Sequence, residues 1–236
     1  KRQGVDSGII KNANKIIAGD MVSSEKETQD AYVYKANDAD DCAKKILTIM
    51  ERLLVKYRID EIQVLSPQRA GTVGVEYLNF IIQEKFNPNN NEVRFLNKQI
   101  SVTLQGDSSA TKFDLFFKKG DKVIHTRNDY SAVWYRREGK TLVIDGENAG
   151  VSNGETGVII SLSEGKDING NPLRRIIVRY DNKFIIYEND FSDLDHAYAL
   201  TIHKCITDDT WLFTSKGLIQ LKDLNNSASV GQFKPI

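Results

Sequence analysis

The periodicity of the apolar residues changes once along this chain of 236 residues, near residue 118. Before that point, apolar positions recur at intervals of three and four, which predicts amphipathic helices. After it they alternate with polar positions, which predicts strands. A chain divided in this way is expected to form a layer of helices and strands first and an all-β unit second.

The first half of the chain predicts the order strand, helix, strand, helix. Segment 31–34 is the first predicted strand, and Asn37 or Asp38 can cap a helix whose apolar positions span 42–57. The run 62–65 reads as a buried strand before a second helix. The apolar face of that helix comprises Val75, Leu78, Ile81, Ile82 and Phe86. The alternation is typical of an α/β fold with a parallel sheet, where ligands bind beyond the carboxyl ends of the strands.

The second half predicts an all-β insert followed by a return to the α/β layer. Asp181 and Asn182 separate two of the predicted strands and form a plausible hairpin turn, although the usual glycine is missing. The return is expected over 193–204. The predicted strands are 122–126, 156–162, 173–180 and 183–187.

The net charge of the whole chain does not favour nucleic-acid binding, but one segment of the chain is basic enough to allow it. The 32 Lys and Arg residues balance 32 Asp and Glu residues, so no overall field attracts nucleic acid. Residues 116–140, however, hold seven Lys or Arg against three acids, with Tyr130, Trp134 and Tyr135 interleaved. Such a stretch could follow a phosphate backbone and stack bases. A solvated hairpin with packed aromatic residues explains the same composition.

Cysteine and histidine are too scarce for a disulfide framework or a metal centre. The chain has two cysteines, Cys42 and Cys205, and three histidines, which fits a reducing cytoplasm and predicts no metal site. No apolar run reaches the length of roughly 18 residues that a membrane span needs. We therefore expect a cytoplasmic protein with no membrane partner.

One candidate for ligand chemistry is Arg69, between the strand at 62–65 and the following helix. An arginine there can reach an anionic ligand, and helix-start amides favour negative charge, although most such arginines are surface residues. The glycine-bearing segment 151–157 is predicted to be a structural turn. The full phosphate-loop pattern is absent from the sequence, so this chain cannot complete nucleotide chemistry alone.

Several separated blocks occur in the order of one protein family. They are Arg2 with Gln3, 7–10, 12–13, 64–71, Gly74, 78–79, 87–88, 119–124, 127–128, 152–157 and 197–204. Together they resemble the carboxy-terminal part of RecD/TraA-type superfamily 1 DNA helicases. The resemblance implies an α/β fold, with a RecA-like parallel-sheet motor domain, the second of two, at 1–115 and 192–204. It also implies a small all-β barrel inserted at 116–191.

The resemblance assigns roles to the matching positions. Arg69 would contact the ATP phosphates, and Arg2 and Gln3 would help to bind the nucleotide. DNA binding and its coupling to the nucleotide site would fall to Thr201, His203, Lys204 and Asn153. The resemblance implies ATP and Mg²⁺ as cofactors of the whole protein. Its implied partners are single-stranded DNA, the missing amino-terminal motor domain and other recombination proteins. Without that domain the fragment is expected to bind no cofactor and to be inactive.

A second resemblance begins where the helicase pattern stops. The Ser-Gln-Gly expected after His203 and Lys204 is absent, and from Cys205 the chain resembles the amino-terminal splicing block of inteins, truncated at 236. Cys205 would attack the carbonyl before it and form a thioester. No downstream Thr-x-x-His block or terminal Asn follows, so the fragment should not splice. A non-enzymatic nucleic-acid-binding module and an autoprocessing protein remain alternatives.

Overall fold

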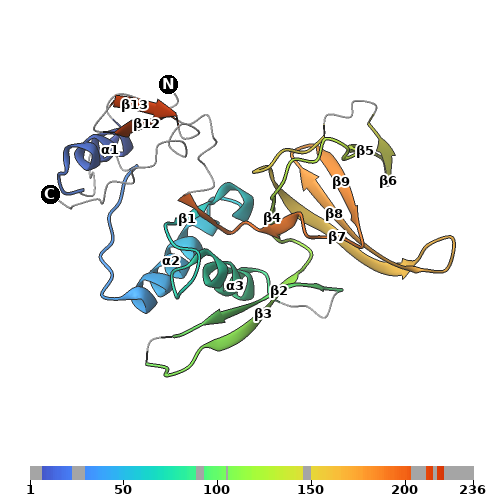
Figure 1. Cartoon of the computed structure of the whole chain (residues 1–236), viewed down its shortest axis with the longest axis horizontal. Helices are drawn as coiled ribbons and strands as arrows, with labels where there is room; N and C mark the ends of the chain where they lie inside the picture. The colour runs from blue at the N-terminus through green and yellow to red at the C-terminus, as the bar shows by residue number, and fades with distance from the viewer. Residues whose placement is uncertain are drawn as a thin grey trace.

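The structure is a computed structural model with a helical region, built from the helices and the strands packed with them, and a large sheet beside it. Helices α1 to α3 lie to one side of a large sheet (Figure 1). The structure describes residues 7–22, 30–88, 93–104, 106–145 and 150–202, and the backbone of strands Trp211–Thr214 (β12) and Gly217–Gln220 (β13).

The two predicted helices are confirmed, and their caps have the expected chemistry. Helix α2 spans Ala39–Leu54, and the Asp38 side chain accepts a hydrogen bond from the Asp41 amide at 2.8 Å. Helix α3 spans Val75–Phe86 and ends at Asn87. A further helix, α1 (Gly8–Ala18), was not predicted, although Ser7 caps it and Gly19 ends it in the left-handed conformation. Within the described residues, no helix combines the length and apolar character that crossing a membrane requires.

A parallel strand pair forms the centre of the helical region. Strand β1 (Val64–Ser66) pairs in parallel with β11 (Ala199–Thr201), after a short 3₁₀ turn, η1 (Ile59–Glu61). Helices α2 and α3 pack there through a buried cluster that comprises Ala43, Met50, Leu78, Ile82, Tyr198 and Ala199. Helices and strands are mixed, as predicted, but this is the one parallel pair among the described strands. The RecA-like sheet therefore remains an expectation.

The strand predicted at 31–34 is wrong. Those residues form no strand, and the side chains of Tyr32 and Tyr34 are 58% and 56% exposed. Aromatic and β-branched residues favour strands because they pack on a half-buried pleated surface. Here no such surface covers them.

The large sheet has seven strands and is antiparallel throughout. Its order is β10-β4-β7-β8-β9-β5-β6. The predicted turn at Asp181 and Asn182 is confirmed, because Tyr180 pairs directly with Lys183 and Asp181 has a positive φ of 49°. The strands are β4 (Lys122–His125), β5 (Tyr135–Glu138), β6 (Thr141–Ile144), β7 (Thr156–Lys166), β8 (Pro172–Tyr180), β9 (Lys183–Glu188) and β10 (Leu194–His196).

The expected barrel is not closed. Strands β10 and β6 lie at opposite ends of the order, and the described residues include no pairing between them. Closure would require these two edges to form hydrogen bonds with each other. The core instead lies on one side of an open sheet and includes Val123, Trp134, Ile159, Ile176 and Val178.

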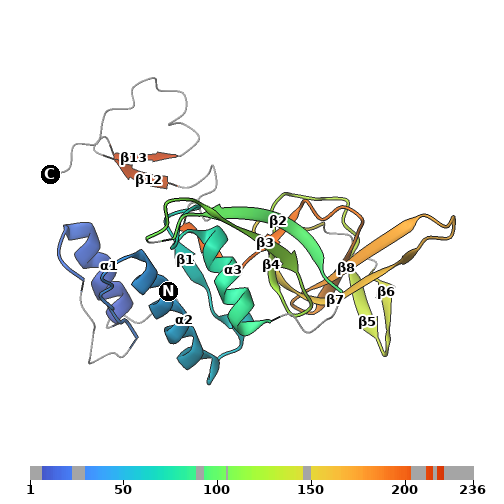
Figure 2. The same cartoon turned by 90° about the horizontal axis from the view of Figure 1, so that it is seen from below.

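A long hairpin joins the helical region to the open sheet. It consists of β2 (Phe95–Val102) and β3 (Thr111–Phe117), which run beside α3 (Figure 2). The Phe113 ring lies 4.7 Å from the Phe80 ring of α3. Phe95 and Phe117 are buried in the core of the seven-stranded sheet. The hairpin therefore fixes the sheet against the helices by apolar contact on both sides.

Candidate functional site

The parallel pair places two candidate segments at one edge. Ser66 and Thr201 are register partners, so β1 and β11 both end there. Ser66 leads into the loop that carries Arg69, and Thr201 begins the segment predicted to couple DNA to nucleotide. The carboxyl edge of a parallel sheet is where ligands of α/β proteins bind.

The loop 66–74 is held in shape by its own polar groups. The Ser66 hydroxyl accepts a hydrogen bond from the Gln68 amide at 3.1 Å and donates one to the Val73 carbonyl at 2.7 Å. At the start of α3, the amides of Val75 and Glu76 donate to the carbonyls of Gln68 and Arg69. These amides are therefore occupied, and the expectation that they attract an anion is not supported. In this loop, the group that can attract an anion is the Arg69 side chain.

Gly74 allows the loop to close on the start of α3. A Cβ atom at this position would lie 2.4 Å from both the carbonyl carbon and the oxygen of Ala70. Backbone atoms cannot move aside as the end of a flexible side chain can. Glycine is therefore required here by close approach rather than by an unusual dihedral angle.

Arg69 lies at the mouth of a cavity of about 380 Å³. Its side chain is 75% exposed, and its Nε atom contacts Glu76 Oε1 at 3.2 Å. The remaining guanidinium N–H groups have no partner among the described residues and can reach an anion. Thr201 lines the same cavity, together with Pro67, Val75, Glu76, Lys98, Asp195, His196 and Leu200.

An ion pair forms part of the cavity wall. Lys98 Nζ donates to both carboxylate oxygens of Asp195 at 2.8 Å. Burial alone would raise the pKa of Asp195, but the charge and hydrogen bonds of Lys98 outweigh it, so that the pKa is lowered. Asp195 is therefore ionised at neutral pH, and Lys98 is its counterion.

A buried polar network lies behind this wall and centres on Asp121. Asp121 is fully buried, and its two carboxylate oxygens contact five hydrogen-bonding groups. The partners are Gln83 Nε2 (2.6 Å), Asn87 Nδ2 (2.7 Å), the Lys118 amide (2.7 Å), Tyr198 Oη (2.9 Å) and His196 Nε2 (3.2 Å). They belong to α3 and its C-cap, to the turn before β4, to the end of β10 and to the segment between β10 and β11. The network therefore joins the helical region to the open sheet.

His196 connects this network to the cavity. It lines the cavity, stacks on Phe117 with a centroid distance of 4.9 Å, and contacts Asn97 Nδ2 through Nδ1 at 3.1 Å. From α3, Asn79 accepts from the Ala199 amide at 2.8 Å and donates to its carbonyl at 3.1 Å. These contacts fix β11, and with it Thr201, against α3.

Sequence reasoning did not identify this network. Asn79 and Asp121 lie inside blocks that carry the family resemblance, but neither was given a role. A detectable signal was the polar pair Asn79 and Gln83, four residues apart on a helix face that is otherwise apolar. Buried polar side chains need partners, and here Gln83 contacts Asp121 whereas Asn79 contacts the Ala199 backbone.

The other predicted site residues are not brought into the cavity. Asn153 lies in an exposed turn before β7, where its amide donates to Asn128 Oδ1 at 2.8 Å. Arg2, Gln3, His203, Lys204 and Cys205 lie outside the described residues. Of the predicted set, the structure brings Arg69 and Thr201 together.

Part of the basic stretch 116–140 is paired with acids of the same chain. Lys118 pairs with Glu84 at 2.7 Å, and Arg136 pairs with Glu138 at 2.8 Å. The Trp134 side chain is buried and meets Tyr180 edge-on. The explanation by packed aromatic residues therefore holds for Trp134, whereas Tyr130 remains 79% exposed. Across the described part of the chain, no group of three His, Cys, Asp or Glu side chains could hold a metal ion.

Comparison with known proteins gives distant, partial matches. No family model matches the chain. It is 29% identical over 148 residues to the uncharacterized protein MJ1519 of Methanocaldococcus jannaschii, a match that covers 61% of this chain and 11% of that protein. It is 26% identical over 144 residues to the ATP-dependent RecD2 DNA helicase of Deinococcus radiodurans, covering 61% of this chain and 14% of the helicase.

These matches suggest a helicase-related region. The chain spans less than one sixth of the length of either relative, at 11% and 14%. The comparisons give no support to an intein interruption at Cys205.

Proposed function

We propose that this chain is part of the second motor domain of an ATP-dependent DNA helicase similar to RecD2. One observation carries the proposal: Arg69 and Thr201 line one cavity at the carboxyl edge of the β1–β11 pair. The resemblance assigns a nucleotide contact to Arg69 and a coupling role to Thr201. The distant match to a helicase supports the same conclusion.

Arg69 has the chemistry that contact with a triphosphate requires. Its guanidinium group is exposed, and Glu76 occupies only its Nε atom among the described residues. When bound, ATP with Mg²⁺ would supply the phosphoryl group whose transfer drives the motor. Arg69 would bind the phosphate oxygens and offset their negative charge, and Glu76 would orient the guanidinium group.

The remaining assignments of the helicase proposal depend on parts beyond this cavity. The missing amino-terminal motor domain would supply the phosphate loop, and Arg2 and Gln3 would approach the same nucleotide. Thr201, His203, Lys204 and Asn153 would contact single-stranded DNA or couple it to the nucleotide. The division into motor residues 1–115 and 192–204 and an insert at 116–191 belongs to this proposal. So do a cytoplasmic location and recombination partners.

The test is an ATPase assay on a whole protein that contains this region and the missing motor domain. Arg69→Ala should lower the DNA-stimulated turnover by at least about 100-fold, because positioned arginines act on developing phosphate charge. Arg136→Ala is the matched control, since Arg136 is exposed on β5 and pairs with its neighbour Glu138. Unchanged turnover in the Arg69 variant would remove the basis of the proposal.

A second proposal concerns Cys205 onward, which would be the start of an intein. Its support is the sequence pattern, in which Cys205 opens the block and Asp209-Thr210 follows. The thiol would attack the carbonyl of Lys204 and replace an amide by a thioester, with the amine of Cys205 as leaving group. In a longer chain, added thiol should then cleave after Lys204. A chain that resists thiol, and in which Cys205→Ala changes nothing, would contradict this assignment.

A further inference from the structure

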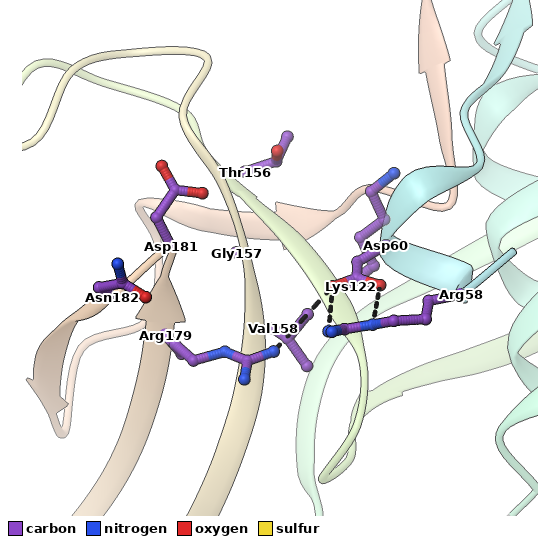
Figure 3. Close-up of a pocket in the computed structure, with 9 residues that line it drawn as sticks. All are labelled: Arg58, Asp60, Lys122, Thr156, Gly157, Val158, Arg179, Asp181 and Asn182. Carbon is purple, nitrogen blue, oxygen red and sulfur yellow. Dashed lines mark hydrogen bonds and ion pairs between the residues drawn. The ribbon is translucent and has the colours of Figure 1, made fainter.

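A second cavity, of about 560 Å³, lies between the helical region and the open sheet. It is formed by the 3₁₀ turn before β1, by β4, and by β7 and the β8–β9 turn. Arg58 and Asp60 of this cavity precede β1 in the sequence, whereas Arg69 of the first cavity comes after β1. The two cavities therefore use residues from opposite ends of this strand. Figure 3 shows side chains from both regions directed towards it.

Two guanidinium groups converge in this cavity from opposite sides. Arg58 extends from the helical region and Arg179 from β8, and their ends approach each other (Figure 3). Asp60 holds both: it accepts from Arg58 Nε at 3.0 Å and Nη2 at 2.5 Å, and lies 4.0 Å from Arg179 Nη2. One carboxylate therefore orients two cations without occupying all their N–H groups.

Both arginines keep access to solvent. Their side chains are 66% and 37% exposed, for Arg58 and Arg179 respectively. Among the described residues, the Arg179 side chain has one ion-pair contact, the long one with Asp60. A planar guanidinium held in this way is suited to bind phosphate oxygens through two parallel hydrogen bonds.

Lys122 adds a third cation at the wall of the cavity. It is 4% exposed, and its Nζ donates to the Ile62 carbonyl at 2.7 Å and to Gln63 Oε1 at 3.0 Å. Burial lowers the pKa of Lys122, and the nearby Asp60 partly opposes this. A buried ammonium group gains most from an anion beside it, because the anion offsets its lost hydration.

The acids of the cavity do not neutralise the positive charge of Arg58, Arg179 and Lys122. Asp60 is already engaged by the arginines, and the Asp181 carboxylate points away from their guanidinium groups (Figure 3). The cavity lining thus holds three cations and two acids, and one of these acids, Asp60, is committed to orienting the two arginines.

We infer that this cavity binds a phosphate group, carried by a nucleic-acid strand or by a free polyphosphate. The inference is independent of the proposed function, because it uses no residue of the Arg69 cavity and needs no ATP hydrolysis. Its failure and that of the helicase proposal can therefore be told apart.

The first experiment is an NMR titration of the isotope-labelled chain with two probes. These are inorganic tripolyphosphate and a single-stranded oligo-dT. Saturable shifts of the Arg58 and Arg179 Nε–H signals with the oligonucleotide identify a strand as the source of the phosphate. The same shifts with tripolyphosphate alone identify a free polyphosphate. If neither probe moves these signals, the inference is overturned.

The second experiment separates a phosphate site from general attraction to a charged surface. Arg58→Gln with Arg179→Gln should weaken binding of the responding probe at least about tenfold, since two charge-assisted contacts are lost. Arg136→Gln, the matched control, should leave affinity within about twofold. Equal affinity of the double variant and the parent chain, with the rest of the amide spectrum unchanged, would contradict the site.

A third variant should strengthen binding. Asp181→Asn removes the free carboxylate at the rim, and asparagine tolerates the positive φ of 49° at this position. Affinity should rise by roughly two- to fivefold, the scale of one exposed charge interaction. A fall in affinity would show that Asp181 takes part in binding a cation or a neutral ligand instead.

Discussion

Ser66 and Thr201 are register partners in the parallel pair, although 134 residues separate them in the sequence. This pairing places the loop that carries Arg69 beside the end of β11. The Asn79 side chain holds β11 through both polar groups of Ala199, two residues before Thr201. The cavity is therefore defined by backbone pairing, and Arg69 adds a charge to it.

Removal of the Arg69 side chain should leave the fold intact. The side chain is 75% exposed and its ion pair with Glu76 is solvated, so Arg69→Ala should change the free energy of unfolding by less than about 0.5 kcal/mol. Urea denaturation of the isolated chain measures this. A larger loss would mean that any fall in turnover reports misfolding rather than loss of a phosphate contact.

Gly74→Ala should be destabilising, because the new Cβ would meet the Ala70 backbone at 2.4 Å. We expect a loss of about 1–3 kcal/mol, the usual range for overpacking. Thermal denaturation provides the measurement. Gly165→Ala is the control: it has open space around its Cβ position and should stay within about 0.5 kcal/mol of the parent chain.

Asp121→Asn should destabilise the chain although it preserves shape. The new NH₂ group would face an amide donor whichever oxygen it replaces, because Gln83 Nε2 lies 2.6 Å from Oδ2 and Asn87 Nδ2 lies 2.7 Å from Oδ1. Breaking a buried charged network costs about 3–5 kcal/mol. Chemical denaturation, with the exposed Asp107→Asn as control, tests this. If both variants were equally stable, the network would not be what joins the two regions.

Stability should fall as the pH is lowered through the range where His125 titrates. Burial lowers the pKa of His125, despite the opposing charges of Asp193, Asp129 and Glu155, and its Nε2 has no partner. As the pH falls, His125 therefore takes up a proton in the unfolded chain first, near pH 6.5, and in the folded chain only at lower pH. The His125 contribution is complete above that pH and is lost below it, with a slope of at most about 1.4 kcal/mol per pH unit.

The measurement is urea denaturation of the parent chain and of His125→Gln at a series of pH values. The variant should lose the part of the slope that lies just below pH 6.5. A variant with the same slope as the parent chain would assign the titration to another group.

Local patterns were sufficient to predict some of the regular elements. The α2 helix followed from its apolar period and from Asp38, and the two-residue turn at Asp181 from the strands on either side. In both cases the determining interactions lie within a few residues in sequence. The strand predicted at 31–34 failed because strand formation needs a surface to pack on, which a local pattern does not reveal.

Long-range arrangement was predicted less well. Whether β10 and β6 remain open edges depends on which strands pair. Apolar residues alternate in the same way in a barrel and in an open sheet, so the sequence pattern could not distinguish the two. The Asp121 network brings Gln83 and His196 into contact although they are 113 positions apart, so no spacing rule identifies it. Arg69 was identified because it follows a predicted strand, whereas Lys98 and Asp195 enter the cavity from distant segments.

The open sheet begins and ends at neighbouring positions, because the Ala197 amide donates to the Lys122 carbonyl at 2.8 Å. A polypeptide of any length could connect two points this close with little extra entropic cost. Replacement of 123–195 by a few glycine-rich residues should therefore leave the β1–β11 pair able to form. This position of the fold can therefore accept or lose an entire sheet while the strand pair that carries the Arg69 loop and Thr201 is retained.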